Sequence, residues 1–369
     1  MPLSALAAEL LLLVADELSL HDVSSLLRTN RPLNALLTPH LYTRAKTLIL
    51  PPRDDLQNPE PLLNNLARLG RIRSVTHLLN AGASYTSGAP PALYTAAEHG
   101  QEEIVSLMIA YHTARTEGVA VHVACQTHNY GRSALHTAAE NGHDATVRVL
   151  LEAGFSEMQQ AQDGATPLVL AVRNAHVQVV RTLLEYGASP NVVVGGMAVA
   201  AARKKPLIHW VVENAFAVRV LRGLDFLPVL RLLLDYGADV LSRDGYRATP
   251  LHSAAKSGEG VSAGLFLRSL GEGMKAGGKL VHSQIVALLI ERGADCNARD
   301  QGGRTPLHNA AEFQDVGVVR MLLEAGAERE AVNGSGKTPV WLASANGWPR
   351  SSGEIVKLLE DWSIGPGEC

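Results

Sequence analysis

The amino-acid sequence predicts an all-α protein, in which a solenoid of about eight stacked helix pairs follows a small N-terminal module of three helices. A stretch resembling Thr-Pro-Leu recurs along the chain, with copies at Thr305 and Thr338 that begin 33 residues apart. Each copy is followed by a second apolar stretch that ends in glycine, as in VRVLLEAG and VRMLLEAG. A leucine-rich run over Leu6–Pro39 predicts the N-terminal module. Repeats of this length indicate stacked supersecondary units.

The N-terminal module is expected over residues 1–47, with a linker at 48–58. Leucine or valine recurs every fourth residue in its first helix, which places an apolar stripe along the helix. Asp22 can cap a second helix and Pro32 can begin a third. Such a small unit buries little apolar surface by itself, so we expect it to contact a partner or the next domain.

The same leucine run superficially resembles a secretory signal. No Lys or Arg precedes Arg28, and Glu9 and Asp16 flank the leucines. The uncharged stretch between these two residues, Leu10–Ala15, has six residues. A signal peptide needs a basic start and a longer apolar centre, and a membrane span is longer still. We therefore interpret the run as part of a folded module.

The repeats are expected over residues 59–362, with insertions near 113–130 and 258–282 and a tail at 363–369. Within one unit, Thr305 suits the N-cap position and Pro306 the first helical position. Ala310 and Ala311 allow a neighbouring helix to approach closely, and Gly326 can end the second helix in a left-handed conformation. A lone pair of short helices cannot bury its apolar face, whereas stacked pairs can. We align Pro206, in KPLIHWVVENA, with the proline of the other copies.

A 33-residue period with Thr-Pro-Leu-His-x-Ala-Ala resembles the ankyrin repeat. The resemblance covers about Pro59 to Trp362 and implies a protein-binding scaffold. It also implies that the motif histidines His136, His252 and His308 are structural and bond across the loop.

The N-terminal run resembles an F-box, with Leu6-Ala7-Ala8-Glu9-Leu10 followed by Leu18, Asp22-Val23 and LRTNRPL. Ala7 stands where the family has proline, and Asn30 where it has Cys or Ser. The resemblance implies docking to a Skp-type adaptor of a cullin-RING ubiquitin ligase. The expected adaptor-binding residues are Leu6, Leu10, Leu11, Val14, Leu18, Val23 and Leu26. The alternative is that these side chains only cap the repeat stack.

The composition and the absence of catalytic motifs indicate that the protein is not an enzyme and that it binds neither nucleic acid nor a membrane. The formal charge is −3, from 33 basic and 36 acidic residues without a long basic run, so we expect neither a nucleic acid nor a membrane partner. The three cysteines, Cys125, Cys296 and Cys369, lie far apart and form no zinc motif or disulfide framework, which favours the cytoplasm or nucleus. GSGKTP resembles a phosphate loop but lacks its glycine spacing, and no catalytic motif occurs, so we expect no cofactor.

The partner-binding surface is expected on the exposed face of the first helices and on the loop tips, which line a groove in stacked helix pairs. Tyr246 and Phe313 are the leading anchors, because exposed aromatic residues often dominate interfaces. Arg247 stands where Gly303 and Gly336 stand elsewhere, so we expect a different turn shape there. The expected partner-binding residues are Glu140, Asn141, Arg173, Asn174, Tyr246, Arg247, Lys256, Asp300, Arg304, Glu312 and Phe313.

The sequence thus predicts a monomeric substrate receptor, in which the F-box-like module holds the ligase and the repeats hold an unidentified target protein. The alternative is a ligase-independent ankyrin scaffold. The exposure of the N-terminal apolar surface distinguishes the two.

Overall fold

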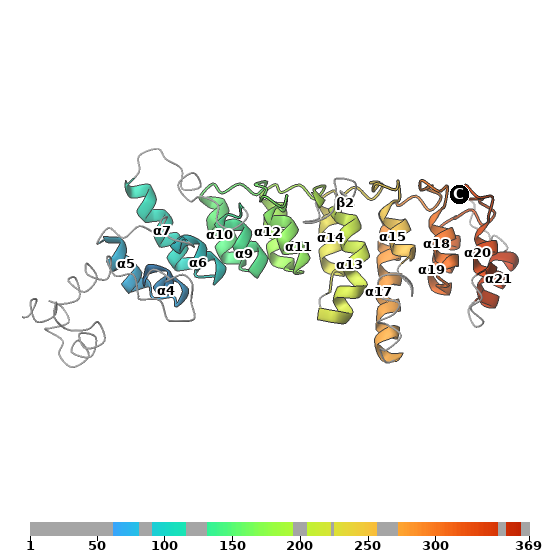
Figure 1. Ribbon diagram of the computed structural model, residues 1–369, viewed down its shortest axis with the longest axis horizontal. Coiled ribbons are helices and arrows are strands. Elements are labelled where there is room, and N and C mark those ends of the chain that lie inside the picture. Colours follow the sequence, from blue (N-terminus) through green and yellow to red (C-terminus); the bar gives the residue numbers. More distant parts are fainter. Residues whose placement is uncertain are drawn as a thin grey trace, which may run out of the picture. The chain divides into compact units, whose positions relative to one another are not determined.

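The computed structural model describes residues 62–80, 91–115, 131–194, 205–222, 225–256, 272–345 and 352–362. The predicted N-terminal module, its linker and the C-terminal tail lie outside these residues. The chain divides into two compact units, Met1–Gln162 and Asp163–Cys369. In the described residues both units consist of short helices that follow one another in pairs, as the sequence predicts (Figure 1).

Unit 1 contains paired helices that pack in two layers. First helices contact first helices, since α4 packs on α6 and α6 on α9, and second helices likewise contact one another. The helices are α4 (Leu62–Arg68), α5 (Ile72–Asn80), α6 (Ala92–Glu98), α7 (Glu102–Arg115), α9 (Ala134–Asn141) and α10 (Asp144–Glu152).

Unit 2 repeats the same arrangement, with α13, α15, α18 and α20 packed in succession and the second helices in the other layer (Figure 1). Strands β1 (Val193–Val194) and β2 (Lys205–Pro206) form a two-stranded antiparallel sheet beside α13. The helices are α11 (Pro167–Arg173), α12 (Val177–Glu185), α13 (Leu207–Arg222), α14 (Leu227–Asp235), α15 (Pro250–Lys256), α17 (Glu272–Glu291), α18 (Pro306–Glu312), α19 (Val316–Glu324), α20 (Pro339–Ala345) and α21 (Ser352–Asp361).

The Thr-Pro dipeptides begin the first helices, as expected. Thr166 is extended at φ −94° and ψ 163°, and its side chain accepts a hydrogen bond of 3.3 Å from the Val169 amide. The following proline lacks an amide hydrogen that the first helical turn would leave unpaired. At the far end of the second helix, Gly326 takes φ 85° and donates its N–H to the Leu323 carbonyl. Because glycine has no Cβ, the chain adopts this left-handed conformation and reverses direction without steric strain.

Small residues fill the interior between neighbouring pairs. Ala310 and Ala311 in α18 are fully buried, as are Val319 and Leu322 in α19. Alanine lets adjacent first helices approach closely, while each fully buried aliphatic side chain of the second layer stabilises the fold by about 2 kcal/mol. The core therefore runs through the stack between the two layers.

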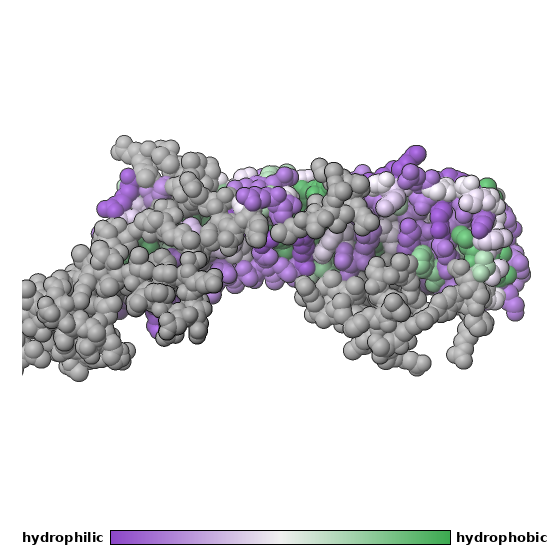
Figure 2. Space-filling view, in the orientation of Figure 1, coloured by the Kyte–Doolittle hydropathy of each residue, from purple (hydrophilic) through white to green (hydrophobic). Residues whose placement is uncertain are grey.

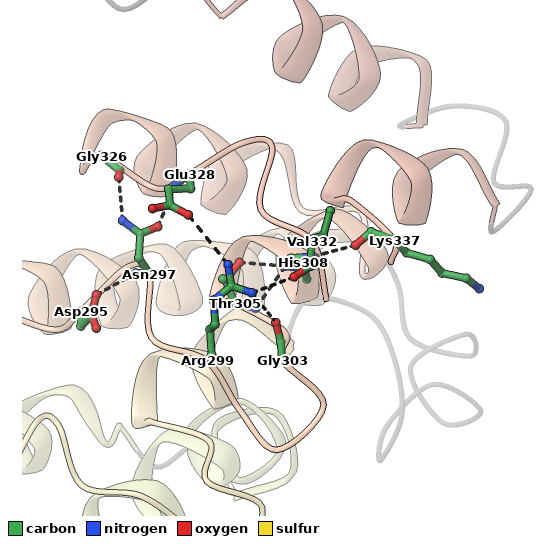
Figure 3. A network of polar contacts seen from close by, with 10 residues as sticks. All are labelled: Asp295, Asn297, Arg299, Gly303, Thr305, His308, Gly326, Glu328, Val332 and Lys337. Carbon is green, nitrogen blue, oxygen red and sulfur yellow. Dashed lines mark hydrogen bonds and ion pairs between the residues drawn. The ribbon is translucent and has the colours of Figure 1, made fainter. Parts of the chain in front are cut away.

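Polar contacts join consecutive loops in unit 2. Asn297 donates to the Gly326 carbonyl at 3.1 Å and accepts from the Glu328 amide at 2.8 Å (Figure 3). Arg299 reaches two carbonyls, that of Gly303 in its own turn and that of Val332 in the next loop. The bonds of Arg299 recur one repeat earlier at Arg243, and those of Asn297 recur two repeats earlier at Asn191. These hydrogen bonds therefore join each of these loops to the loop of the next repeat.

The structure corrects the alignment of the divergent repeat. Helix α13 begins at Leu207, so Pro206 takes the N-cap position that Thr305 has in α18, and Leu207 takes the proline position. The shift of one residue makes His209, rather than Ile208, the equivalent of His308. His209 is buried and its Nε2 bonds the Ser242 carbonyl in the next loop at 3.1 Å, whereas its Nδ1 lacks the N-cap amide that His308 has, since Pro206 carries no N–H.

The structure also places helices in the predicted insertions. Helix α7 continues to Arg115, and α17 begins at Glu272, so residues 272–282 belong to a second helix that is longer than the others in unit 2. In the described part of the chain, no helix combines the length and apolar character needed to cross a membrane.

Candidate interaction face

The candidate site is the exposed side of the first helices together with the loop tips before them. We call this surface the first-helix face, and in each repeat it includes the residue before the N-cap and the exposed residues of the first helix near the eighth position after it. Where residues of unit 2 are coloured in Figure 2, hydrophilic side chains predominate on the visible side, with small apolar areas between them. A polar face with a few exposed aromatic residues is a chemistry suited to binding protein partners.

A recurring ion pair characterises this face. A basic residue before the N-cap contacts a glutamate eight positions later on the same first helix. All six side chains are partly covered, with 19 to 36% of their surface exposed. The pairs are Arg132–Glu140 at 2.5 Å, Lys205–Glu213 at 2.6 Å and Arg304–Glu312. In unit 2, the two cations Lys205 and Arg304 are therefore each engaged by a carboxylate of their own repeat.

Two repeats of unit 2 depart from this pattern in the same way. Ala165 and Ala248 replace the basic residue and are buried, while Arg173 and Lys256 replace the glutamate. Arg173 is half-buried and Lys256 is exposed. Among the described residues, no ion pair or hydrogen bond engages either cationic head group. The face therefore carries two cations that lack the carboxylate found in the neighbouring repeats.

The loop before α15 has the most exposed aromatic side chain of this face. Tyr246 is 57% exposed, whereas Phe313, the second expected anchor, is half-buried at the C-cap of α18. The neighbouring Arg247 is exposed as well. The structure thus supports Tyr246 as an accessible contact more strongly than Phe313.

The expectation of a different turn at Arg247 was wrong. Arg247 takes φ 59°, close to the 71° of Gly303 and the 69° of Gly336. Its N–H bonds the Asp244 carbonyl at 2.9 Å, as the N–H of Gly303 bonds that of Asp300 at 3.0 Å. The turn keeps its shape because the surrounding bonds hold the backbone, and the arginine adopts a left-handed conformation that favours glycine.

Asp300 stabilises the turn in which it lies. Its carboxylate accepts from the amides of Gly302 and Arg304, both at 2.9 Å. Asp244 holds the preceding turn in the same manner, through the amides of Tyr246 and Ala248. These carboxylates have their hydrogen-bonding capacity largely directed into the protein.

The two asparagines expected on the face also bond within their own helices. Asn141 donates to the Thr137 carbonyl at 2.9 Å, and Asn174 donates to the Leu170 carbonyl at 3.3 Å. Asn174 is half-buried, and Asn141 is exposed. Both cover the C-terminal ends of first helices, where carbonyl groups lack helical partners.

The motif histidines are buried and structural, in line with the resemblance. His308 Nδ1 accepts from the Thr305 amide at 3.1 Å and lies 2.9 Å from Thr305 Oγ1, while its Nε2 bonds the Lys337 carbonyl at 3.1 Å (Figure 3). His252 makes the equivalent bonds to Thr249 and to the Arg304 carbonyl. Burial lowers the pKa of both histidines, because the charged imidazolium is poorly solvated there.

Sequence reasoning missed the Lys205–Glu213 pair, because the divergent repeat was aligned one residue out of register. The signal was present, since a basic residue and a glutamate eight apart also occur at Arg132 and Glu140. It also missed Lys337, whose Nζ lies 3.6 Å from the centre of the half-exposed Trp341 ring. That contact is a cation–π interaction on the last first helix.

A shallow open hollow of about 280 Å³ lies elsewhere, between the second helices α19 and α21. Arg320 and Lys357 line it together with Glu354 and Asp361, so its charges are mixed. Among the described residues, no cluster of three or more His, Cys, Asp or Glu side chains could hold a metal ion. The expected adaptor-binding residues, from Leu6 to Leu26, lie outside the described part of the chain.

Comparison with known proteins identifies similar repeats. Residues 125–193 and 274–364 match the family model described as ankyrin repeats, in three copies. Ankyrin repeat protein FPV223 of fowlpox virus (strain NVSL) is 30% identical over 99 residues, which make up 25% of this chain and 70% of that protein. FPV219 of the same virus is 35% identical over 109 residues, covering 26% of this chain and 24% of that protein.

Mouse ankyrin repeat and SOCS box protein 16 is 33% identical over 180 residues, covering 49% of this chain and 33% of that protein. The chain thus spans about a quarter of the length of FPV219 and a third of the length of the mouse protein. The crystal structure of the human ASB11 ankyrin repeat domain aligns with a TM-score of 0.50 at 24% identity, over 74% of this chain and 99% of that domain. The ankyrin repeat domain of Bcl-3 aligns with a TM-score of 0.50 at 23% identity, over 73% and 99%. At these identities the two structures show the shared fold.

Proposed function

The chain belongs to the ankyrin repeat family, and on that premise we propose that it is a substrate receptor of a cullin-RING (SCF-type) ubiquitin ligase. Ankyrin repeat proteins are non-enzymatic scaffolds that bind other proteins, so the role of this chain is interaction rather than catalysis. In the proposal, an array of about eight repeats holds the target protein on its first-helix face. The F-box-like module over residues 1–47 holds a Skp-type adaptor.

The observation that carries the proposal is the presence of two potential binding modules on one chain. The leucine-rich run over Leu6–Pro39 has more apolar residues than a three-helix unit can bury by itself. The repeats provide a separate polar face with accessible Tyr246, Arg173 and Lys256. The name of the mouse relative likewise joins ankyrin repeats to a second module, a SOCS box.

The mechanism that follows is one of proximity. The receptor would hold a lysine of the target protein near the ubiquitin-loaded enzyme, and would contribute no catalytic group. Holding two reactants together replaces a bimolecular encounter by an effectively intramolecular one, which raises the reaction rate strongly.

The alternative is a ligase-independent scaffold whose N-terminal helices cap the repeats. One observation favours it: Leu69 and Ile72, at the junction of α4 and α5, are 54% and 37% exposed. Apolar side chains at the end of a repeat stack are sites that a capping element covers.

A binding experiment with a purified Skp-type adaptor tests the proposal. The full chain is compared with the variant Leu10→Asp/Val14→Asp, which would bury two charges in the apolar contact and cost several kcal/mol of binding free energy. The matched control is Leu241→Asp/Val332→Asp, because both residues are 50% exposed on the repeats. Circular dichroism establishes that each variant is folded.

We expect the wild type and the control variant to bind the adaptor and the Leu10/Val14 variant not to bind. If the wild type does not bind, the ligase proposal is wrong and the scaffold alternative remains. The proposal further places a monomeric chain in the cytoplasm or nucleus. The buried free thiol of Cys296 accords with a reducing compartment.

A further inference from the structure

We propose that the first-helix face of unit 2, from α11 to α15, binds an extended acidic segment of the target protein, with Arg173 and Lys256 each pairing with a carboxylate. This inference rests on the proposed function, because it names the chemistry of the partner that the repeats would hold.

The first step is that two repeats differ from the ion-paired repeats at both positions of the pair. In α13 and α18 of this unit, a basic residue before the helix and a glutamate eight positions later form a pair, as Lys205 and Glu213 do. In the repeats of α11 and α15 the basic residue is a buried alanine and the glutamate position holds Arg173 or Lys256. A cation with no local carboxylate is better satisfied by one that a ligand brings.

The second step concerns the carboxylates of the protein itself. On the described part of this face, they already have partners within the protein and so do not compete with a ligand carboxylate for Arg173 and Lys256. Glu213, on the helix between the two cations, accepts from Lys205 Nζ at 2.6 Å and from Ser253 Oγ at 3.2 Å. Asp244 accepts two amides of its own turn. Asp163, in the loop before α11, accepts the Ala165 amide of its own turn. These three carboxylates are therefore engaged, and with Arg173, Lys205, Arg243, Arg247 and Lys256 the face carries an excess of positive charge although the whole chain has a formal charge of −3.

The third step concerns the loop tip above Lys256. Tyr246 is 57% exposed, and Arg247 is exposed at φ 59°, where glycine stands in the equivalent turns. A non-glycine residue in this left-handed conformation destabilises the turn, because its Cβ is close to the following carbonyl oxygen. The tip thus keeps an aromatic ring and a third cation at an energetic cost to the turn, and both are residue types that dominate interfaces.

The spacing of the repeats sets the length of the segment. Helices α11, α13 and α15 pack in succession, and neighbouring helices lie about 8–10 Å apart. Arg173 and Lys256 stand two helices apart, so their separation is about 20 Å. An extended chain rises about 3.3 Å per residue, so two carboxylates about six residues apart would reach both cations.

The test uses a phage-displayed library of random 12-residue peptides, selected on the full chain at low salt. We expect enriched peptides to contain Asp or Glu pairs separated by five to seven residues. A selected peptide is then synthesised with fluorescein, together with its counterpart carrying Gln or Asn at the acidic positions. Anisotropy gives the affinity of each.

The variant Arg173→Glu/Lys256→Glu reverses both charges on the face and is expected to weaken binding of the acidic peptide by about tenfold or more. The matched control, Arg181→Glu/Arg231→Glu, makes the same change on exposed arginines of the second helices α12 and α14. With anisotropy measured at about 0.1 M salt, it should leave the affinity within about twofold, since charges farther away than the Debye length of about 10 Å are screened.

The inference is overturned if the selected peptides lack acidic pairs, if the amide counterpart binds equally well, or if the reversal variant keeps wild-type affinity. Tighter binding of a fluorescein-labelled 12-nucleotide single strand, lost in the same variant, would also overturn it in favour of nucleic acid. None of these results affects adaptor binding through residues 1–47, so failure of this inference and failure of the ligase proposal are distinguishable.

Discussion

At the residue scale, the motif histidines join the start of one first helix to the next loop. His308 accepts the Thr305 amide through Nδ1 and bonds the Lys337 carbonyl through Nε2, with its ring fully buried. Because Nδ1 accepts, the proton resides on Nε2, so the ring is neutral. A neutral imidazole thus supplies both an acceptor and a donor at one buried point, which no aliphatic side chain can do.

We predict that His308→Ala lowers the free energy of unfolding by about 3 kcal/mol, because two buried backbone groups lose their partners and a cavity remains. Urea denaturation followed by circular dichroism measures the change. Arg320→Ala, at an exposed position of the adjacent second helix, is the control and should change stability by less than about 0.5 kcal/mol. Equal effects of the two substitutions would contradict the structural role of His308.

His282 in α17 makes stability depend on pH. Burial lowers its pKa from 6.5 to about 4. As pH falls below 6.5, the unfolded chain takes up a proton at this histidine while the folded chain does not, so folding loses stability down to about pH 4. Burial lowers the pKa of His252 and His308 too, which adds in the same direction.

We predict that the free energy of unfolding decreases steadily between pH 6.5 and 4, with His282 contributing about 3 kcal/mol at 1.36 kcal/mol per pKa unit. His282→Gln removes this titration, so its profile should be flatter over the same range. Urea unfolding at half-unit pH steps measures both profiles. Parallel profiles for the two proteins would show that His282 does not cause the dependence.

At the scale of one element, two equivalent turns should respond to substitution with opposite changes in stability. Arg247 and Gly303 both take positive φ, at 59° and 71°. A side chain added at Gly303 would place Cβ 2.9 Å from the backbone nitrogen of Gly334 in the next loop. Gly303 is therefore required by both conformation and contact, whereas the turn at Arg247 accommodates a side chain.

We predict that Arg247→Gly raises the free energy of unfolding by about 0.5 kcal/mol, since relief of the left-handed conformation exceeds the entropy cost of glycine. Gly303→Ala should lower it by about 2 kcal/mol, because Cβ meets backbone that cannot move without breaking the loop contact. Thermal or urea unfolding of both variants measures the difference. A loss of stability in Arg247→Gly would mean that its side chain stabilises the turn.

These turns also show how far the sequence could predict the elements. Thr-Pro dipeptides predicted the start of α18 correctly, because capping and proline chemistry are local. Arg247 was misjudged because its turn is also held from outside the repeat, by the bond from the Gln301 amide of the next repeat to the Tyr246 carbonyl. Pro206 was misaligned because it occupies an N-cap here rather than the first helical position. The Lys205–Glu213 ion pair was missed for the same reason, since its recognition depends on the register of that repeat.

At the scale of the whole molecule, each repeat contacts only its neighbours, so a local change should have a local effect. In unit 2, α20 packs against α18 and α21, at the end of the described array, whereas α15 packs between α13 and α18. Leu359 in α21 and Leu251 in α15 are almost completely buried, so truncation of either leaves a cavity and costs about 2–5 kcal/mol locally.

We predict that Leu359→Ala speeds amide hydrogen exchange in α20 and α21 while leaving α13 and α15 unchanged, because opening of an end repeat breaks one interface. Leu251→Ala should speed exchange in α13, α15 and α18 together, because an interior repeat shares interfaces on both sides. Mass spectrometry of peptic fragments resolves these regions. Exchange that rises uniformly through unit 2 in both variants would show that the unit opens as one cooperative body, and the nearest-neighbour description would then be wrong.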